Sequence, residues 1–430
     1  MDPGAGRRIV FAPTPRGANW SRVPDISIIT LFHNRWDLAR RYIDQWRAAR
    51  SGGAGMELIL GDSASSDGSA EVASSASDIA DVTLFQENLG FARGNNRLAR
   101  RARGDLLVFL NYDVHLVPGW LEALAAVFSG RPGLGIAGNV QFSVRARVTD
   151  HAGIFFDSAG KPFHFRPPAG PLEGLGFLTV PAVTGACMAI RRELFESLGG
   201  FDEGYRNSYE DVDLCMRARA SGAGVGLAAR SAIWHHVSSS PGRYNSEETN
   251  AVRFAERWER EAIALSAIHP PELPVGAGQG AVHPVLAAYE TLQAYFPSAL
   301  GYSEEDSATL IYSRSRWEEV EVPLSPGFDA KVHPLRLDPA KSRGRFRLSR
   351  ISLRIEGESR PFWEATGSLL AGACRPSGTC RLQSSGGELC FESDGDDPQL
   401  LIRLPADGWG RKERIWFAAS LWSDCREESP

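Results

Sequence analysis

The chain has 430 residues, of which 43% are hydrophobic and 23% are charged. A chain of this length exceeds one typical hydrophobic core, so we expect two or three domains. The formal net charge of −5 gives no electrostatic reason to expect a nucleic-acid partner. No stretch reaches the roughly 20 continuous apolar residues of a membrane-spanning helix, and no apolar segment of signal-peptide length follows the N-terminal arginines. These features predict a cytoplasmic protein without a transmembrane segment.

The first half of the chain alternates apolar runs with helical patterns. Residues 1–24 are rich in Arg, Gly and Pro and predict a flexible N-terminal arm. Apolar runs at 26–31, 56–60, 82–85 and 106–110 predict strands, and the last, which has no polar alternation, suits a strand buried on both faces. Because helical patterns separate these runs, we predict a mostly parallel α/β sheet with right-handed connections.

The regular alternation stops in the middle of the chain. Residues 142–181 carry Gly, Pro, Phe and His without a sustained period, which is typical of a functional or mobile segment. A predicted strand at 183–190 and a polar helix at 247–265 complete a domain that we place at residues 25–265. Residues 266–285 are rich in Pro, Gly and Ala and predict a linker.

The last part of the chain, residues 286–430, has the composition of an all-β domain. After one helical pattern at 284–295, short β-type runs follow one another to the end of the chain. The run at 345–355 alternates sharply between apolar and charged residues, as in an antiparallel sheet with one solvated face. We predict a small β-sandwich.

Three polar residues follow the apolar run at 106–110, namely Asn111, Asp113 and His115. A Pro-Gly pair then opens the next helical pattern, so these residues lie between a strand and a helix. In open α/β sheets, ligands bind beyond the carboxyl ends of the strands. Polar and acidic groups in that place predict a site for a divalent metal ion and a phosphate group.

Seven segments of the chain, taken in order, resemble one known family. They are ISIITLFHNR, GDSASSDGS, NLGFARGNN, LNYDVHLVPGWL, TGACMAIRRELFESLGGFDE, YEDVDLCMRARASG and WHHVSSS. Their order and spacing over residues 25 to 260 resemble the inverting glycosyltransferases of family 2, which have the GT-A fold, in the rhamnosyltransferase-like branch. The β region resembles sandwich modules of some bacterial surface-polysaccharide glycosyltransferases. The resemblance implies a nucleotide-diphosphate sugar as donor, Mg²⁺ or Mn²⁺ as cofactor, and a glycan or lipid-linked saccharide as acceptor.

The resemblance also implies the catalytic residues. Glu210 and Asp211 match the family's E-D motif, whose second carboxylate is the general base. Asp211 would therefore take the proton of the acceptor hydroxyl, and Glu210 would orient it or assist with the acceptor. A structural alternative exists, because Ser208 and Asp211 also have the spacing of a capping box at a helix start.

The family's metal motif, D-x-D or a variant, is N-Y-D in this chain. The resemblance makes Asp113 the metal-binding carboxylate, with Asn111 in place of the other acid beside the donor diphosphate. His235 matches the family histidine that adds a metal ligand or contacts the diphosphate, and His236 and His115 are its rivals. The structural alternative for Asp113 is a helix cap or a turn.

The remaining site residues are those implied to bind the nucleotide: two are expected beyond the first strand, Thr30 and Asn34, and the others at or after the ends of the second and third strands. They are Thr30, Asn34, Asp62, Asn88, Gly90, Arg93 and Asn95. Asp62 ends the second strand, where the family binds the nucleobase or ribose. Arg93 either pairs with a phosphate or is one of several solvated helix arginines. Trp234 either stacks on a sugar or packs in the core.

Together these motifs imply a cytoplasmic, metal-assisted, inverting hexosyl- or rhamnosyltransferase of bacterial surface polysaccharide synthesis. Peripheral attachment to the inner membrane and oligomer formation stay open. A first alternative is a catalytically degenerate carbohydrate-binding or assembly protein, which Asn111 favours and the retained Asp113, Asp211 and His235 disfavour. A second alternative is a nucleotidyltransferase-like enzyme, because that fold also places acids at strand ends.

Overall fold

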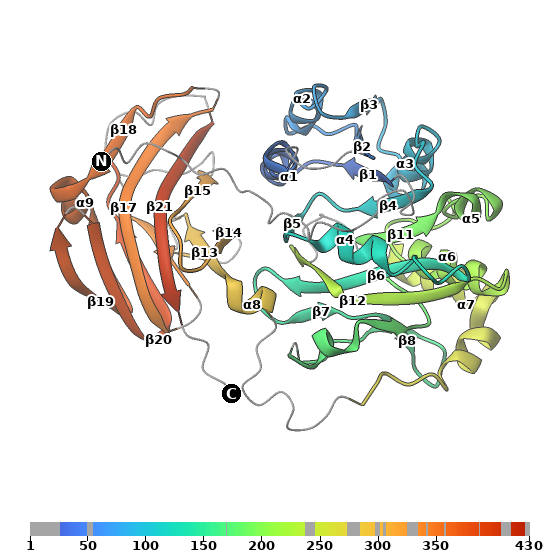
Figure 1. Ribbon diagram of the computed structural model, residues 1–430. Helices are drawn as coiled ribbons and strands as arrows, with labels where there is room; N and C mark the ends of the chain where they lie inside the picture. The colour runs from blue at the N-terminus through green and yellow to red at the C-terminus, as the bar shows by residue number, and fades with distance from the viewer. Residues whose placement is uncertain are drawn as a thin grey trace. The chain divides into compact units, whose positions relative to one another are not determined.

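The computed structural model describes twelve stretches of the chain. They are residues 26–49, 55–168, 170–236, 246–272, 284–296, 302–303, 307–324, 334–340, 343–356, 358–386, 388–405 and 414–425. The predicted arm 1–24 and most of the predicted linker, residues 273–283, lie outside the described residues. The chain divides into two compact units (Figure 1). The first comprises residues 1–143 and 148–275, and the second comprises residues 144–147 and 276–430.

The first unit contains a ten-stranded sheet, and its first four strands are parallel neighbours in the order β4-β1-β2-β3. Their bounds are β1 Ile26–Phe32, β2 Met56–Ser63, β3 Asp81–Phe85 and β4 Leu106–Leu110. Every residue of β4 is buried, as its unbroken apolar run predicts. Val108 joins the core cluster on one face, while Phe109 packs on Phe195 and Phe201 on the other.

Beyond β4 the sheet becomes mixed. The additional strands are β5 Val114–Leu116, β6 Leu134–Ser143, β7 Thr149–His151, β10 Phe177–Thr179, β11 Cys187–Arg191 and β12 Gly224–His235. Strand β11 runs antiparallel to both β4 and β6, whereas β12 runs parallel to β6. The predicted mostly parallel sheet therefore describes the β4-β1-β2-β3 half and is wrong for the other half.

Helices cover the sheet of the first unit (Figure 1). They are α1 Trp36–Ala49, α2 Ser69–Ser74, α3 Gly90–Ala99, α4 Trp120–Ala126, α5 Arg192–Ser197, α6 Glu210–Ala220 and α7 Glu247–Leu265. Helix α1 buries Leu38, Tyr42, Ile43 and Trp46, which recur at helical spacing and pack into the core beneath β1. The segment predicted to be irregular contains a β8–β9 hairpin, Ile154–Phe156 with Pro162–His164, and a 3₁₀ turn.

The second unit contains one branched nine-stranded sheet whose inner side chains share a single core cluster. Its strands are β13 Tyr289–Tyr295, β14 Ser307–Ser313, β15 Glu318–Pro323, β16 Leu335–Asp338, β17 Gly344–Ile355, β18 Trp363–Thr366, β19 Cys374–Gly386, β20 Glu388–Ile402 and β21 Ile415–Cys425. Two short helices, α8 Pro284–Ala288 and α9 Gly367–Ala373, accompany them. In β17 the apolar residues Phe346, Leu348, Ile351 and Leu353 are buried, as its alternation predicts.

One predicted element of this unit is wrong. The helical pattern at 284–295 forms a helix only as far as Ala288, and β13 follows directly. Strand β13 pairs with β14 along its whole length, so that Leu292 and Ala294 enter the core. Pairing with neighbouring strands outweighs the local helical pattern here. The predicted class of an α/β domain followed by a smaller all-β domain is confirmed. Among the described residues, no helix is long and apolar enough to cross a bilayer.

Candidate active site

Asp113 and His235 lie together at the carboxyl end of β4. Asp113 immediately precedes β5, which pairs antiparallel with the end of β12, so that Val114 lies opposite His235. The backbone N–H of His236 donates to the Asp113 carbonyl oxygen at 2.8 Å, which fixes this register. The His235 Nε2 atom then lies 3.4 Å from Asp113 Oδ1, and the side chains are only 6% and 8% exposed.

This pair fits a divalent metal ion. Neither ring nitrogen of His235 has a hydrogen-bond partner among the described residues, although the ring is buried. A neutral imidazole in that state retains a lone pair for a metal, and the adjacent carboxylate supplies an oxygen ligand. The described part of the chain contains no group of three or more His, Cys, Asp or Glu residues suited to a metal. Diphosphate oxygens and water would have to complete the coordination.

The neighbours of this pair are also held in place. The Asn111 N–H donates to the carbonyl oxygen of Ala186 at 2.9 Å, which joins the end of β4 to the residue before β11. The Tyr112 hydroxyl donates to the His33 carbonyl oxygen at 2.9 Å. Burial lowers the pKa of His236 to about 3, so this rival ligand is neutral at physiological pH.

Glu210 and Asp211 form the first turn of α6. One Asp211 carboxylate oxygen, Oδ2, accepts the Gly185 N–H at 2.8 Å, and Oδ1 accepts the N–H of Val212 at 2.8 Å. Asp211 is half-buried, whereas Glu210 is buried. Each oxygen of this half-buried carboxylate accepts one backbone N–H and keeps a further lone pair, with which it can still accept a proton from a substrate.

The capping-box alternative for Asp211 is wrong. Helix α6 has Tyr209 as its N-cap, and no side-chain cap bond forms there. The Ser208 hydroxyl accepts the Asn250 amide N–H at 2.8 Å instead, and Asn250 also donates to the Ser208 and Arg206 carbonyl oxygens. A distant residue on α7 thus replaces the local pattern that the sequence offered.

Asp62, near the end of β2, and Asn34, just after β1, both hydrogen-bond to Ser65. Asp62 is 1% exposed, and its two oxygens accept the backbone N–H and the hydroxyl of Ser65 at 2.9 and 2.5 Å. The Asn34 N–H donates to the same hydroxyl oxygen at 2.7 Å, and its side-chain oxygen accepts the Ser66 N–H. Asn34 adopts a positive φ of 58°, a conformation that asparagine tolerates better than most residues. The two residues therefore shape the loops that would face a nucleotide.

Asp67 and Thr30 have structural positions. The Asp67 carboxylate accepts the N–H groups of Trp36 and Ser69 at the starts of α1 and α2. The expectation that Thr30 lies beyond the first strand is wrong, because β1 continues to Phe32. Thr30 is fully buried and shares a 2.5 Å hydrogen bond with the Tyr42 hydroxyl in the core.

Asn88, Gly90 and Arg93 line a cavity of about 550 Å³. Its other lining residues are Glu87, Leu89, Glu203, Tyr205, Arg206 and Asn207. The Asn88 side-chain oxygen accepts the Gly90 N–H at 3.0 Å, and Arg93 lies 3.3 Å from Glu87 in an ion pair. Asn95 is absent from this lining; it is 2% exposed and donates to the Phe91 carbonyl oxygen within α3.

The structure adds a residue that the sequence motifs did not single out, His33. Its Nδ1–H donates to the Ser63 carbonyl oxygen at 2.9 Å, and its Nε2 lies 3.0 Å from the Asn88 amide nitrogen. His33 therefore joins the ends of β1, β2 and β3. Its place beside Asn34 in the first motif was the available signal. Trp234 is fully buried against Phe142, so the core alternative for it is correct.

Comparison with known proteins connects this geometry to a family. Residues 27–199 match the family model described as Glycosyl transferase family 2. The chain is 32% identical over 245 residues to the O-antigen biosynthesis protein RfbC of Myxococcus xanthus, covering 55% of this chain and 18% of that protein. It is 27% identical over 218 residues to the N-acetylglucosaminyl-diphospho-decaprenol L-rhamnosyltransferase of Mycobacterium tuberculosis (strain ATCC 25618 / H37Rv), covering 44% of this chain and 69% of that enzyme.

A structural comparison gives a weaker likeness. The crystal structure of GalNAc-T7 with UDP, GalNAc and Mn²⁺ is 20% identical, with a TM-score of 0.44, and the match covers 56% of this chain and 50% of that one. The chain spans only 18% and 21% of the lengths of RfbC and of protein y4gI from Sinorhizobium fredii (strain NBRC 101917 / NGR234). The first unit has the predicted GT-A-like fold, and its residues 27–199 are similar to the family 2 glycosyl transferase model.

Proposed function

We propose that the first unit is a metal-assisted inverting glycosyltransferase that moves a sugar from a nucleoside-diphosphate donor to a saccharide hydroxyl. The observation that carries the proposal is the 3.4 Å approach of the His235 ring to the Asp113 carboxylate, in a unit whose residues 27–199 match the family 2 model. Two buried ligand groups at the carboxyl end of a central strand are what a donor diphosphate with its metal ion requires.

In this proposal Asp113 and His235 hold Mg²⁺ or Mn²⁺, with Asn111 beside them. The bound ion would supply Lewis-acid stabilisation of the departing diphosphate. A carboxylate oxygen suits either ion, and an imidazole nitrogen suits Mn²⁺ better than Mg²⁺, which prefers oxygen ligands. The chain contributes the two ligands and the backbone contacts that keep them buried and together.

Asp211 acts as the general base in the proposed reaction. The acceptor oxygen attacks the anomeric carbon from the face opposite the diphosphate, the bond to the diphosphate breaks, and the hydroxyl proton passes to the Asp211 carboxylate. The Gly185 N–H keeps one carboxylate oxygen in place, so the carboxylate needs little reorganisation during the transfer. Glu210, buried in the same helical turn, orients Asp211 or contacts the acceptor.

Asn34, Asp62, Asn88, Gly90 and Arg93 form the proposed nucleotide-binding region. The Ser65-centred contacts of Asp62 and Asn34 make this region rigid before the donor arrives. Arg93 would have to exchange its exposed Glu87 partner for a phosphate, a step that costs little for an exposed ion pair. Thr30 and Asn95 are left out because Thr30 hydrogen-bonds to Tyr42 in the core and Asn95 hydrogen-bonds to the Phe91 carbonyl oxygen within α3.

The acceptor in this proposal is a glycan or a lipid-linked saccharide of bacterial surface polysaccharide. An O-antigen biosynthesis protein and a rhamnosyltransferase named for a decaprenol-linked substrate among the relatives support this class, with a rhamnosyl or hexosyl donor. A lipid-linked acceptor implies work at the cytoplasmic face of the inner membrane, where peripheral attachment would suffice.

Thermal unfolding with nucleoside diphosphates tests the proposal. UDP, dTDP and GDP are each added with and without Mn²⁺, with CMP as the control, to the wild type and to Asp113→Ala. A ligand at about 100 times its Kd stabilises the folded state by about 2.7 kcal/mol. We expect one diphosphate to stabilise the wild type in a metal-dependent manner, and Asp113→Ala to lose that dependence. No stabilisation by any of them would favour the degenerate carbohydrate-binding alternative.

A further inference from the structure

The start of helix α6 lacks the usual local support. Its N-cap residue, Tyr209, has a positive φ of 70° and makes no side-chain cap bond, and Asn207 nearby has a φ of 58°. The first backbone N–H groups of a helix have no intrahelical partners, so an uncapped first turn frays easily. Because this turn carries Glu210 and Asp211, contacts from elsewhere must keep it in place.

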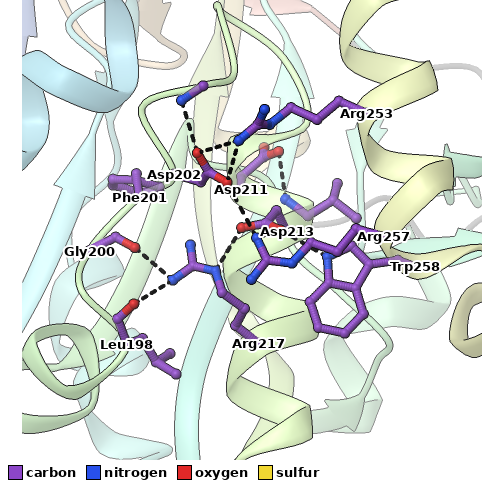
Figure 2. Close-up of polar contacts among 12 residues, drawn as sticks. Leu198, Gly200, Phe201, Asp202, Asp211, Asp213, Arg217, Arg253, Arg257 and Trp258 are labelled. Carbon is purple, nitrogen blue, oxygen red and sulfur yellow. Dashed lines mark hydrogen bonds and ion pairs between the residues drawn. The ribbon is translucent and has the colours of Figure 1, made fainter.

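Asp213 makes several of those contacts, beside the hydrogen bonds of Asn250 to Ser208. It is completely buried, and its Oδ1 accepts the Trp258 Nε1–H at 2.8 Å and lies 3.2 Å from Arg257 NH1, both on α7. Its Oδ2 accepts the Arg217 Nε–H at 2.7 Å. Figure 2 shows Asp213 between Arg217 and the α7 residues Arg257 and Trp258.

Arg217 extends this network to the loop before α6. Its NH1 group donates to the carbonyl oxygens of Leu198 and Gly200 at 2.9 and 2.8 Å (Figure 2). Asp213 thus joins the first turns of α6 to α7 on one side and, through Arg217, to the 198–200 loop on the other. Removing a partner from a buried carboxylate leaves an uncompensated buried charge, which is strongly destabilising.

Helix geometry connects Asp213 with Asp211. Two residues separate by roughly 200° around a helix when they are two positions apart, so these carboxylates point to opposite sides of α6. Asp211 contacts Gly185, and Asp213 contacts α7 and Arg217. Because Asp211 and Asp213 belong to the same helical turn, contacts that hold Asp213 in place also set the direction of the Asp211 side chain.

We propose that Asp213 is the positioning residue of the active site, which aims the Asp211 carboxylate through its bonds to Trp258 and Arg217. The proposal rests on the proposed function, in which Asp211 is the general base. A misplacement of about 1 Å can cost about 100-fold in rate even when it begins away from the reacting atoms.

Asp213→Asn tests this role, because it preserves the size of the side chain and removes its charge. Trp258→Phe is a second variant that keeps an aromatic ring but removes the indole N–H together with part of the ring system. Asp202→Asn is the matched control: Asp202 pairs with Arg253 and with the same Arg257, but it lies outside α6. Each protein is assayed for nucleoside diphosphate release from dTDP-rhamnose and UDP-hexoses with a polyprenyl-diphosphate-linked N-acetylglucosamine acceptor, and for its metal-dependent thermal shift with UDP and dTDP.

We expect Asp213→Asn to lower kcat about 10- to 100-fold with an unchanged donor KM and an unchanged nucleotide shift. Trp258→Phe should lower kcat less, and Asp202→Asn should lower thermal stability without lowering kcat. The proposal is overturned if Asp213→Asn keeps the wild-type kcat, or if kcat in all three variants falls only in proportion to folded protein. Asp211→Asn in the same assay separates the positioning role of Asp213 from the proposed function. Full turnover in that variant would contradict the proposed function itself.

Discussion

The Nε2 atom of His235 lies 3.4 Å from Oδ1 of Asp113, although His235 ends β12 and Asp113 follows β4. The antiparallel pairing of β5 with β12 brings the two residues together. A strand register therefore sets the spacing of the two candidate metal ligands. Any change that shifts β5 by one residue would turn the neighbouring side chains to the other face and separate the pair.

The metal assignment predicts different results for His235 and His115. His235→Ala should abolish the Mn²⁺-dependent part of the nucleotide thermal shift, because it removes one of two protein ligands. His115→Ala is the matched control. His115 lies on β5 opposite Trp234, the residue before His235 on β12. Equal losses in the two variants would contradict a specific role for His235. Isothermal titration with Mn²⁺ at a fixed nucleotide concentration measures the affinity directly.

We expect Ser65→Ala, in the loop between β2 and α2, to lower both the stability of the protein and its affinity for the nucleotide. This change removes the hydroxyl that donates to the buried Asp62 carboxylate and accepts the Asn34 N–H. The loss of one charge-assisted hydrogen bond to a buried carboxylate lowers the free energy of unfolding by about 1–3 kcal/mol. Urea unfolding measures this loss, and the nucleotide shift should weaken in parallel. Ser66→Ala, which keeps its backbone bond to Asn34, should change both quantities less; the reverse order would contradict the role assigned to Ser65.

A buried histidine predicts acid sensitivity of the first unit. Burial, followed by the neighbouring His164, holds the pKa of His151 well below 6.5, its ordinary value. The unfolded chain therefore binds a proton in the range where the folded protein does not, so stability falls as pH drops below about 6.5. The loss amounts to about 1.4 kcal/mol for each pH unit. His151→Gln should flatten this dependence between pH 6.5 and 5, as followed by urea unfolding; an unchanged slope would contradict it.

The sequence predicted best the elements whose residues determine them locally. The unbroken apolar run of β4 and the alternation of β17 were read correctly, and α7 has the predicted bounds of 247–265. The errors arose where contacts with segments distant in the sequence determine the local structure. Asn250 on α7 takes the Ser208 hydroxyl from the predicted capping box, and pairing with β14 turns the end of a helical pattern into β13.

The candidate site divides in the same way. Family-like motifs singled out Asp113, Asp211 and His235 as candidates, but only the β5–β12 register brings Asp113 to His235. Thr30 was misplaced beyond β1, although the predicted strand at 26–31 already contained it and β1 continues to Phe32. The sequence did not indicate Asp213 as a functional candidate, because an acidic residue in the first turn of a helix is usually on the surface. Its partners Trp258 and Arg257 lie on another helix.

The central claim, that this domain transfers sugars with Asp211 as the base, is tested most directly by Asp211→Asn in a paired experiment. Nucleoside diphosphate release from dTDP-rhamnose and UDP-hexoses is measured with the polyprenyl-linked acceptor, beside the metal-dependent nucleotide shift of the same protein. A general base at Asp211 predicts a wild-type shift and a loss of turnover of about 10²- to 10⁴-fold, the usual contribution of such a base. Full turnover in Asp211→Asn, or a wild-type protein that neither binds a nucleotide nor releases one, would contradict it.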